Sequence, residues 1–283
     1  MRGVANAVSA APAPAPAPGF GEALERLAEL WPKPRIASGA PGEGERTAAD
    51  LFSDKEWIEA LLAAQMRITP GLDRKAQAAY LASYYATTIT TAGAGLIVGC
   101  GIVPDLAPEK VWLGIDPARD DLAFQDSSLR FSPSPVAVRG GKAPVDMFRV
   151  QIEAHFAPLV QRLHRATALP PHALWRLVGD ALGAGLLDAG QKFGAEDEAK
   201  RIALDVLKRP GSALSNCQLH FFEVSVPNPG GGLATRTVLA RGGCCRLYTA
   251  PGGDVCTNCV LRKPGERERL AEDALRRELE NRR

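Results

Sequence analysis

Four of the six cysteines in this sequence lie close together near its C-terminal end. They are Cys244, Cys245, Cys256 and Cys259, whereas Cys100 and Cys217 stand apart. Four thiolates within one short segment can supply every ligand of a tetrahedral zinc ion or of an iron-sulfur cluster. The segment therefore predicts a metal centre. The spacing of the cysteines indicates which of the two, a zinc ion or an iron-sulfur cluster, they bind.

The spacing favours a 2Fe-2S cluster over a single zinc ion. It reads Cys-Cys-x10-Cys-x2-Cys, and only its second half has the short gap that lets both sulfurs converge on one ion. Adjacent side chains such as those of Cys244 and Cys245 diverge in extended or helical backbone, so they more easily serve two metal atoms. A structural zinc ion and a redox or vicinal disulfide are the alternatives for the same cysteines.

The glycines around these cysteines suit a cluster that lies close to the backbone. Glycine allows a close approach, and we expect the backbone N–H groups there to turn towards sulfur. The glycines are Gly242, Gly243, Gly252 and Gly253. Hydrogen bonds from backbone N–H groups to sulfur are one way in which a protein sets the reduction potential of a cluster.

Basic residues surround the cysteines as well. From Arg236 to Lys263 the chain has five basic residues and a single acidic one, Asp254. We expect this charge to offset the negative charge of a cluster and to attract an anionic substrate or an acidic electron donor. The candidate docking residues for substrate or donor are Arg241, Arg246 and Tyr248.

The string Cys-Cys-x2-Tyr, which ends at Tyr248 and is followed by Gly-Gly-Asp and Cys-x2-Cys, resembles the C-terminal signature of the FhuF-like ferric siderophore reductases. The resemblance is strongest over residues 236 to 262. It implies that the four cysteines hold a 2Fe-2S cluster at the end of a mostly helical chain. It also implies one-electron reduction of siderophore-bound Fe(III) to Fe(II), which is held far less tightly, with no catalytic residue beyond the cluster.

The resemblance implies a ferric siderophore as substrate and an external electron donor, either a ferredoxin-like protein or an NAD(P)H-linked reductase. An external donor is expected because the glycine run from Gly93 to Gly99 has its third glycine one position late for a dinucleotide loop, and no strand precedes it. The resemblance also leaves room for transient association with a siderophore importer. Two other functions stay open, namely a zinc-stabilised binding module and a 2Fe-2S electron carrier without its own iron substrate.

Charge and hydropathy exclude several other partners. The formal net charge of the 283 residues is only +2, so we expect no nucleic-acid partner. Residues 76–104 contain no charged side chain, but their threonines, glycines and tyrosines keep the hydropathy low. We therefore expect a buried helix followed by a turn, and no stable membrane insertion. Because residues 1–15 lack the apolar stretch of a secretion signal, we expect a cytoplasmic protein with reduced thiols.

The pattern of apolar residues predicts an α+β fold that is predominantly helical, with a small antiparallel sheet and a C-terminal cysteine-rich loop that binds the cluster. Residues 1–18 form a low-complexity Ala/Pro tether. Residues 19–240 form a helix-rich domain, and residues 241–283 form the 2Fe-2S-binding segment with a charged tail helix. A hairpin of residues 219–226 and 233–240 is expected to lead directly into Cys244.

Some local details can be predicted as well. Ser53 and Glu56 have the spacing of a capping box and predict a helix start. A second helix is expected to begin at Asp73 and to lose its pattern after Tyr85. The isolated Cys100 and Cys217 are expected to be small buried hydrophobic residues rather than ligands. The four histidines, His155, His164, His172 and His220, are expected to be structural or surface residues.

Overall fold

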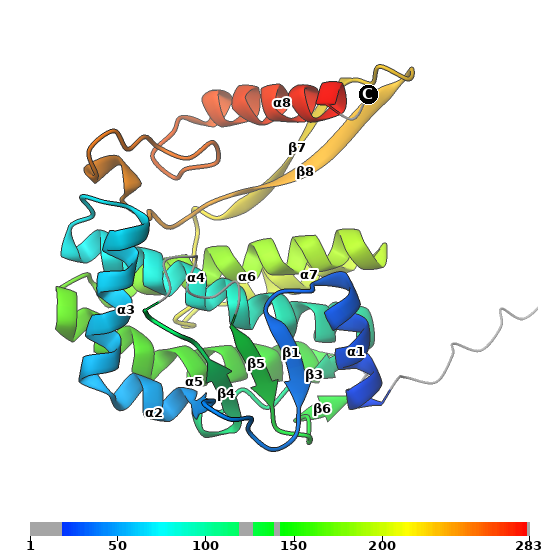
Figure 1. The fold of residues 1–283 in the computed structure, drawn as a ribbon. Helices are drawn as coiled ribbons and strands as arrows, with labels where there is room; N and C mark the ends of the chain where they lie inside the picture. The colour runs from blue at the N-terminus through cyan, green and yellow to red at the C-terminus, as the bar shows by residue number, and fades with distance from the viewer. Residues whose placement is uncertain (1–18, 119–126, 139–141, 282–283) are drawn as a thin grey trace, which may run out of the picture.

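Two long helices, α4 (Arg74–Gly95) and α6 (Pro171–Phe193), lie against each other at the centre of the molecule (Figure 1). The structure is a computed structural model that describes residues 19–118, 127–138 and 142–281, so the predicted tether of residues 1–18 lies outside it. Asp73 caps α4 by accepting the N–H of Ala76 at 2.7 Å, as its predicted start requires. The predicted loss of helix after Tyr85 is wrong, because α4 continues into a π-helical turn, Leu96–Cys100.

Close packing of small residues explains why α4 continues. Thr88, Thr90 and Gly93 are all buried in the molecule. A Cβ atom on Gly185 of α6 would lie 3.3 Å from the carbonyl oxygen of Thr90, so the two backbones nearly touch. The small side chains that weaken the helical pattern in the sequence are therefore those that let α4 pack against α6.

The other α-helices of the described residues surround this pair, and two short 3-10 helices, Pro108–Lys110 and Leu247–Thr249, lie in the connections. The surrounding α-helices are α1 (Phe20–Leu30), α2 (Ala48–Ser53), α3 (Lys55–Ile68), α5 (Lys142–Thr167), α7 (Glu196–Leu207) and α8 (Pro264–Asn281). The predicted capping box is wrong by one position, because Asp54 accepts the N–H of Trp57 at 2.9 Å and caps α3, whereas Ser53 ends α2. Asp54 can take this position because its carboxylate accepts the N–H of the third residue of the helix.

In the described part of the chain the strands form three small sheets. The largest has the order β1 (Arg35–Ser38), β5 (Ser128–Phe131), β4 (Val111–Gly114) and β2 (Arg46–Thr47). Its pairs are antiparallel except for β1 with β5, which is parallel. The other two sheets are β3 (Ile102–Val103) with β6 (Ala137–Val138) and the hairpin of β7 (His220–Pro227) with β8 (Leu233–Ala240). The predicted α+β class is confirmed.

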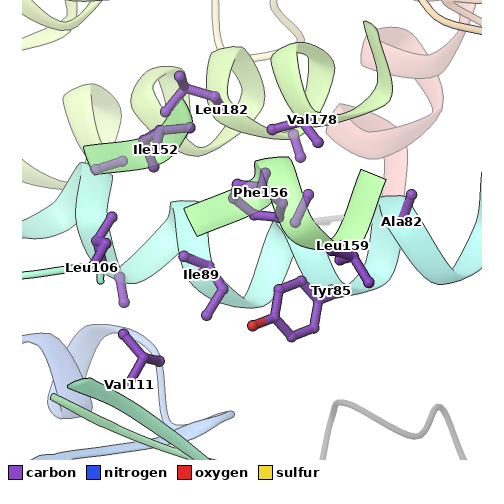
Figure 2. Close-up of a cluster of buried hydrophobic side chains, with 14 of the residues drawn as sticks. Ala82, Tyr85, Ile89, Leu106, Val111, Ile152, Phe156, Leu159, Val178 and Leu182 are labelled. Carbon is purple, nitrogen blue, oxygen red and sulfur yellow. The ribbon is translucent and has the colours of Figure 1, made fainter. Parts of the chain in front are cut away.

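The main core lies where α4, α5 and α6 meet (Figure 2). Tyr85 and Phe156 are among its largest buried side chains. His155 is also fully buried there, with Nε2 2.8 Å from the Tyr85 hydroxyl and Nδ1 2.7 Å from Leu106 O. Cys100 is buried, as predicted. The same prediction is wrong for Cys217, which is exposed.

The hairpin and α8 have a small core of their own. Val224 and Val226 of β7 pack with Ala271 and Leu275 of α8, and Figure 1 shows α8 lying along the hairpin. The predicted division of the chain at residue 240 stays a prediction. Among the described helices, none is both long enough and apolar enough to cross a membrane.

Candidate metal centre

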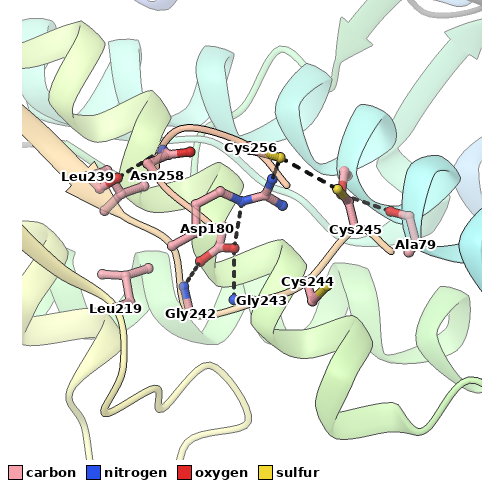
Figure 3. Close-up of polar contacts among 12 residues, drawn as sticks. Ala79, Asp180, Leu219, Leu239, Gly242, Gly243, Cys244, Cys245, Cys256 and Asn258 are labelled. Atoms are coloured by element: carbon pink, nitrogen blue, oxygen red, sulfur yellow. Dashed lines mark hydrogen bonds and ion pairs between the residues drawn. The ribbon is translucent and has the colours of Figure 1, made fainter. Parts of the chain in front are cut away.

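The cysteine segment begins where β8 ends, and Asn258 ties its two halves together. The backbone N–H of Arg241 donates to Asn258 O at 3.1 Å, and Asn258 Nδ2 donates to Leu239 O at 2.9 Å. Asn258 stands between Cys256 and Cys259, so these bonds hold the Cys-x2-Cys turn beside the end of β8 (Figure 3). The predicted hairpin therefore positions both halves of the cysteine motif.

Asp180, a carboxylate in the middle of α6, holds the backbone that leads into the cysteine pair. It accepts the N–H of Gly242 at 2.7 Å, the N–H of Gly243 at 2.9 Å and the Nε–H of Arg241 at 3.1 Å. Its side chain is only 5% exposed. Burial raises the pKa of Asp180, although the charge of Arg241 acts against this rise. Because three donors satisfy the carboxylate, α6 anchors the start of the segment.

The glycines before the cysteine pair serve close packing rather than hydrogen bonds to sulfur. Their N–H groups donate to Asp180, so the expectation that they turn towards sulfur is wrong for Gly242 and Gly243. A Cβ atom on Gly242 would overlap the side chain of Asn216. The backbone N–H of Arg246 approaches sulfur instead, at 3.4 Å from Cys244 Sγ.

One thiol of the adjacent pair lies beside one thiol of the Cys-x2-Cys turn. Cys245 Sγ lies 3.8 Å from Cys256 Sγ (Figure 3). Burial raises the pKa of Cys244, and the charge of Cys259 adds to that rise. In a tetrahedral site with metal–sulfur bonds of about 2.3 Å, two sulfurs are about 3.8 Å apart. The Cys245–Cys256 pair therefore has the spacing of two ligands on one metal atom.

The four thiols also suit a cluster that is partly shielded from solvent. Cys259 is 4% exposed, and the other three are half-buried. The contact between the two thiols lowers the pKa of Cys245 and raises the pKa of Cys256. Within the described ranges, no three histidine, cysteine or carboxylate side chains are grouped tightly enough to hold a single ion. The donor set is purely thiol, which is the set that iron-sulfur clusters use.

Two tyrosines of α4 lie beside the thiols. Tyr80 and Tyr84 have ring centroids 5.8 Å apart in an edge-to-face arrangement. Burial raises the pKa of both phenols, and the charge of Cys245 adds to each rise. They therefore stay protonated next to the cysteines and can act as hydrogen-bond donors.

Sequence reasoning missed several residues of this site, namely Asp180, Asn258, Tyr80 and Tyr84. The sequence does contain a sign that Asp180 is buried and partnered, because it is a lone carboxylate among apolar residues of its helix, such as Leu177 and Ala181. Such a residue needs buried partners. The partners themselves lie about sixty residues away in the chain, so only the fold identifies them.

The structure also places the three candidate docking residues. The Arg241 side chain is 18% exposed and lies between Asp180 and Cys256, with Nη1 3.7 Å from Cys256 Sγ. Arg246 is 27% exposed and pairs with Asp73 at 2.7 Å. Tyr248 is 47% exposed. Their role in docking stays a prediction, and Tyr248 is the most accessible of the three.

The other arginines near the cysteines also have acidic partners. Arg236 pairs with Glu278 at 2.7 Å, and Arg262 pairs with Glu266. Arg241 and Arg246 have acidic partners too, so all four arginines near the cysteines contact a carboxylate. These contacts reduce the net positive charge that the site offers to an anionic substrate.

Comparison with known proteins gives one finding. Residues 241–261 match the family model described as the FhuF 2Fe-2S C-terminal domain. This segment contains all four clustered cysteines, so the resemblance seen in the sequence is confirmed there, and the cofactor that it indicates is a 2Fe-2S cluster. No curated protein matches the chain.

Proposed function

We propose that this protein is a ferric siderophore reductase, because its cysteine segment matches the FhuF 2Fe-2S C-terminal domain. It would reduce siderophore-bound Fe(III) to Fe(II) by one electron and release the iron in the cytosol. One observation carries the proposal: all four clustered cysteines lie within the segment that matches this domain, and Cys245 Sγ is 3.8 Å from Cys256 Sγ.

The change in iron charge explains how one electron frees the substrate iron. The hard oxygen donors of a siderophore hold Fe(III) extremely tightly, whereas Fe(II), with one charge less, is bound more weakly and exchanges. When bound, the 2Fe-2S cluster supplies that electron. The protein need only hold the four thiolates, keep Cys259 out of solvent and place the positive charge of Arg241 beside Cys256.

Electrons must reach the cluster from outside the chain. We propose a ferredoxin-like protein or an NAD(P)H-linked reductase as the donor, since the sequence offers no convincing nicotinamide or flavin motif. Arg246 and Tyr248, at 27% and 47% exposure, are candidates for the surface that such a donor contacts. A siderophore importer that delivers the substrate would be a transient partner.

The first experiment is spectroscopic. Absorption and EPR spectra of anaerobically purified protein, recorded before and after dithionite, are combined with quantification of iron, sulfide and zinc. We expect two irons and two sulfides per chain and a rhombic spin-half signal after reduction. A colourless protein with one tightly bound zinc ion would contradict the proposal and favour the zinc-stabilised binding module.

The second experiment separates a reductase from an electron carrier. The dithionite-reduced protein is mixed with ferric complexes of a trihydroxamate and of a tricatecholate chelator, and Fe(II) is captured with a chromogenic ligand. We expect reoxidation of the cluster with one Fe(II) formed per cluster. A protein that exchanges electrons with a ferredoxin but with neither ferric chelate would be a carrier.

A further inference from the structure

Two hollows meet beside the Cys-x2-Cys turn. The larger, of about 710 Å³, is an open groove between α6, β8 and α8. The smaller, of about 250 Å³, lies between α4, α6 and the end of β8. Both are lined by Ala184, Leu239 and Asn258, so they adjoin each other. In Figure 1 the hairpin and α8 lie above α6.

The place where the hollows meet is next to the thiols. Asn258, which lines both hollows, stands between Cys256 and Cys259, and its hydrogen bond to Leu239 O fixes its side chain there. Arg241 lines the smaller hollow and has Nη1 3.7 Å from Cys256 Sγ. A molecule in these hollows would therefore contact residues that themselves touch or flank the cysteines, which is the close range that electron transfer needs.

The size and lining of the groove suit a small molecule rather than a protein. Binding sites for small molecules have volumes of about 300 to 1,000 Å³, whereas a protein partner needs roughly 800 Å² of surface on each side. The groove walls combine apolar side chains, such as Leu187 and Val238, with polar groups of Gln191 and Thr257. Within it, Arg236 and Glu278 neutralise each other at 2.7 Å.

We propose that this groove binds the ferric chelate, with the iron directed towards Asn258 and the smaller hollow. The inference rests on the proposed function, because it locates the substrate of that reaction. Mixed walls fit a ferric chelate, whose oxygen donors surround the metal and whose spacers are apolar. The cluster that Cys244, Cys245, Cys256 and Cys259 would hold would supply the one electron that converts Fe(III) to Fe(II), and no bond to the protein would form or break.

Ala184 offers a direct test, because it is exposed on α6 and lines both hollows. The substitution Ala184→Trp should fill the place where they meet without disturbing the core. Ala274→Trp on α8 should obstruct the same groove from its opposite wall, and it keeps the test valid if the first variant does not fold. The matched control is Ala154→Trp, an exposed alanine of α5 that lines neither hollow.

Two readouts are needed. Binding of redox-inert gallium(III) complexes of desferrioxamine B and of a tripodal tricatecholate is measured by calorimetry on the oxidised protein. Reoxidation of the reduced cluster is then followed by stopped flow with the corresponding Fe(III) complexes, and with ferricyanide as a small oxidant that needs no groove. We expect both groove variants to weaken chelate binding at least tenfold, while the ferricyanide rate changes less than twofold. The control should behave as the wild type.

The outcomes separate the two proposals. If the wild type binds a chelate and both groove variants bind it equally well, the groove is not the site, although the proposed function stands. If the wild type binds neither gallium complex and neither Fe(III) complex reoxidises its cluster, the proposed function itself fails. A parallel loss of ferricyanide reactivity would show damage to the cluster and would overturn the assignment of the groove.

Discussion

The carboxylate of Asp180 holds the guanidinium of Arg241 at 3.1 Å, and Arg241 Nη1 in turn lies 3.7 Å from Cys256 Sγ. Burial works against the charge on Arg241, but Asp180 and the cysteines more than offset this and raise its pKa. The arginine is thus permanently positive beside a candidate ligand. The negative partner bonds to Nε, whereas Nη1 faces the sulfur.

We predict that Arg241→Gln lowers the reduction potential of the cluster. Reduction adds a negative charge, and the loss of a nearby positive charge makes that addition less favourable. The expected change is at least about tenfold in the ratio of reduced to oxidised protein at a fixed potential, or about 59 mV for one electron. An EPR-monitored redox titration measures it. Arg246→Gln is the control, because that guanidinium pairs with Asp73 and should shift the potential less.

Asp180 should act on the potential through Arg241. We therefore expect Asp180→Asn to change the potential in the wild-type background but to have little further effect when Arg241 is already glutamine. A double-mutant cycle of the two substitutions, read as reduction potential, tests this coupling. Equal effects of Asp180→Asn in both backgrounds would mean that it does not work through the arginine.

Serine substitutions should identify the ligands. Replacing Cys244, Cys245, Cys256 or Cys259 by serine is expected to abolish or reshape the absorption and EPR spectra, since a hydroxyl is a poor replacement for a thiolate ligand. Cys217→Ser is the control, because Cys217 is exposed and stands apart in the sequence. A normal spectrum and full iron content after one of the four substitutions would remove that cysteine from the ligand set.

Gly242→Ala should destabilise the fold and the cysteine loop together. The added methyl group would overlap Asn216 in a buried place, and overpacking of this kind costs about 1 to 3 kcal/mol. Denaturant unfolding and iron content are the measurements. Gly265→Ala, at the start of α8, is the matched control, because nothing lies within 4 Å of its added Cβ. Unchanged stability and iron content in Gly242→Ala would contradict the packing described here.

Buried His155 should make the fold sensitive to acid. Burial lowers its pKa to about 4, whereas the unfolded chain has the ordinary value of 6.5. Between these values the unfolded state binds a proton that the folded state does not, so stability falls as the pH drops from about 6.5 to about 4. The slope from this group is at most about 1.4 kcal/mol per pH unit.

The test compares denaturant unfolding of the wild type and of His155→Gln between pH 5 and 6.5. We expect a lower stability for the variant throughout, because the hydrogen bond between Tyr85 and His155 is lost, but a shallower decline of stability with falling pH. Acid effects on the cluster are shared by both proteins and cancel in the comparison. If the free energy of unfolding falls equally steeply with pH in both proteins, His155 does not contribute to the acid sensitivity of the fold.

Many elements of the fold follow from the sequence because they depend on neighbouring residues. Apolar spacing and prolines define helices such as α1, and the turn residues after Pro227 define the hairpin that leads to Cys244. The sequence predicts Ser53 as the cap of α3, whereas the structure has Asp54, one position later. The two are hard to tell apart in the sequence because both residue types cap helices. The C-terminal end of α4 is harder to predict from the sequence, because the threonines and glycines there weaken the local helical pattern.

The cysteine spacing by itself predicted a metal centre and favoured a 2Fe-2S cluster over zinc, because the order and number of thiols along the chain limit which metal centres they can bind. The contact of Cys245 Sγ with Cys256 Sγ was decided by the tertiary structure. So were the contact of Asp180 with Arg241 and the groove at Asn258. These features join segments far apart in the chain, and only the packing of α4, α6 and the hairpin sets the distances between them.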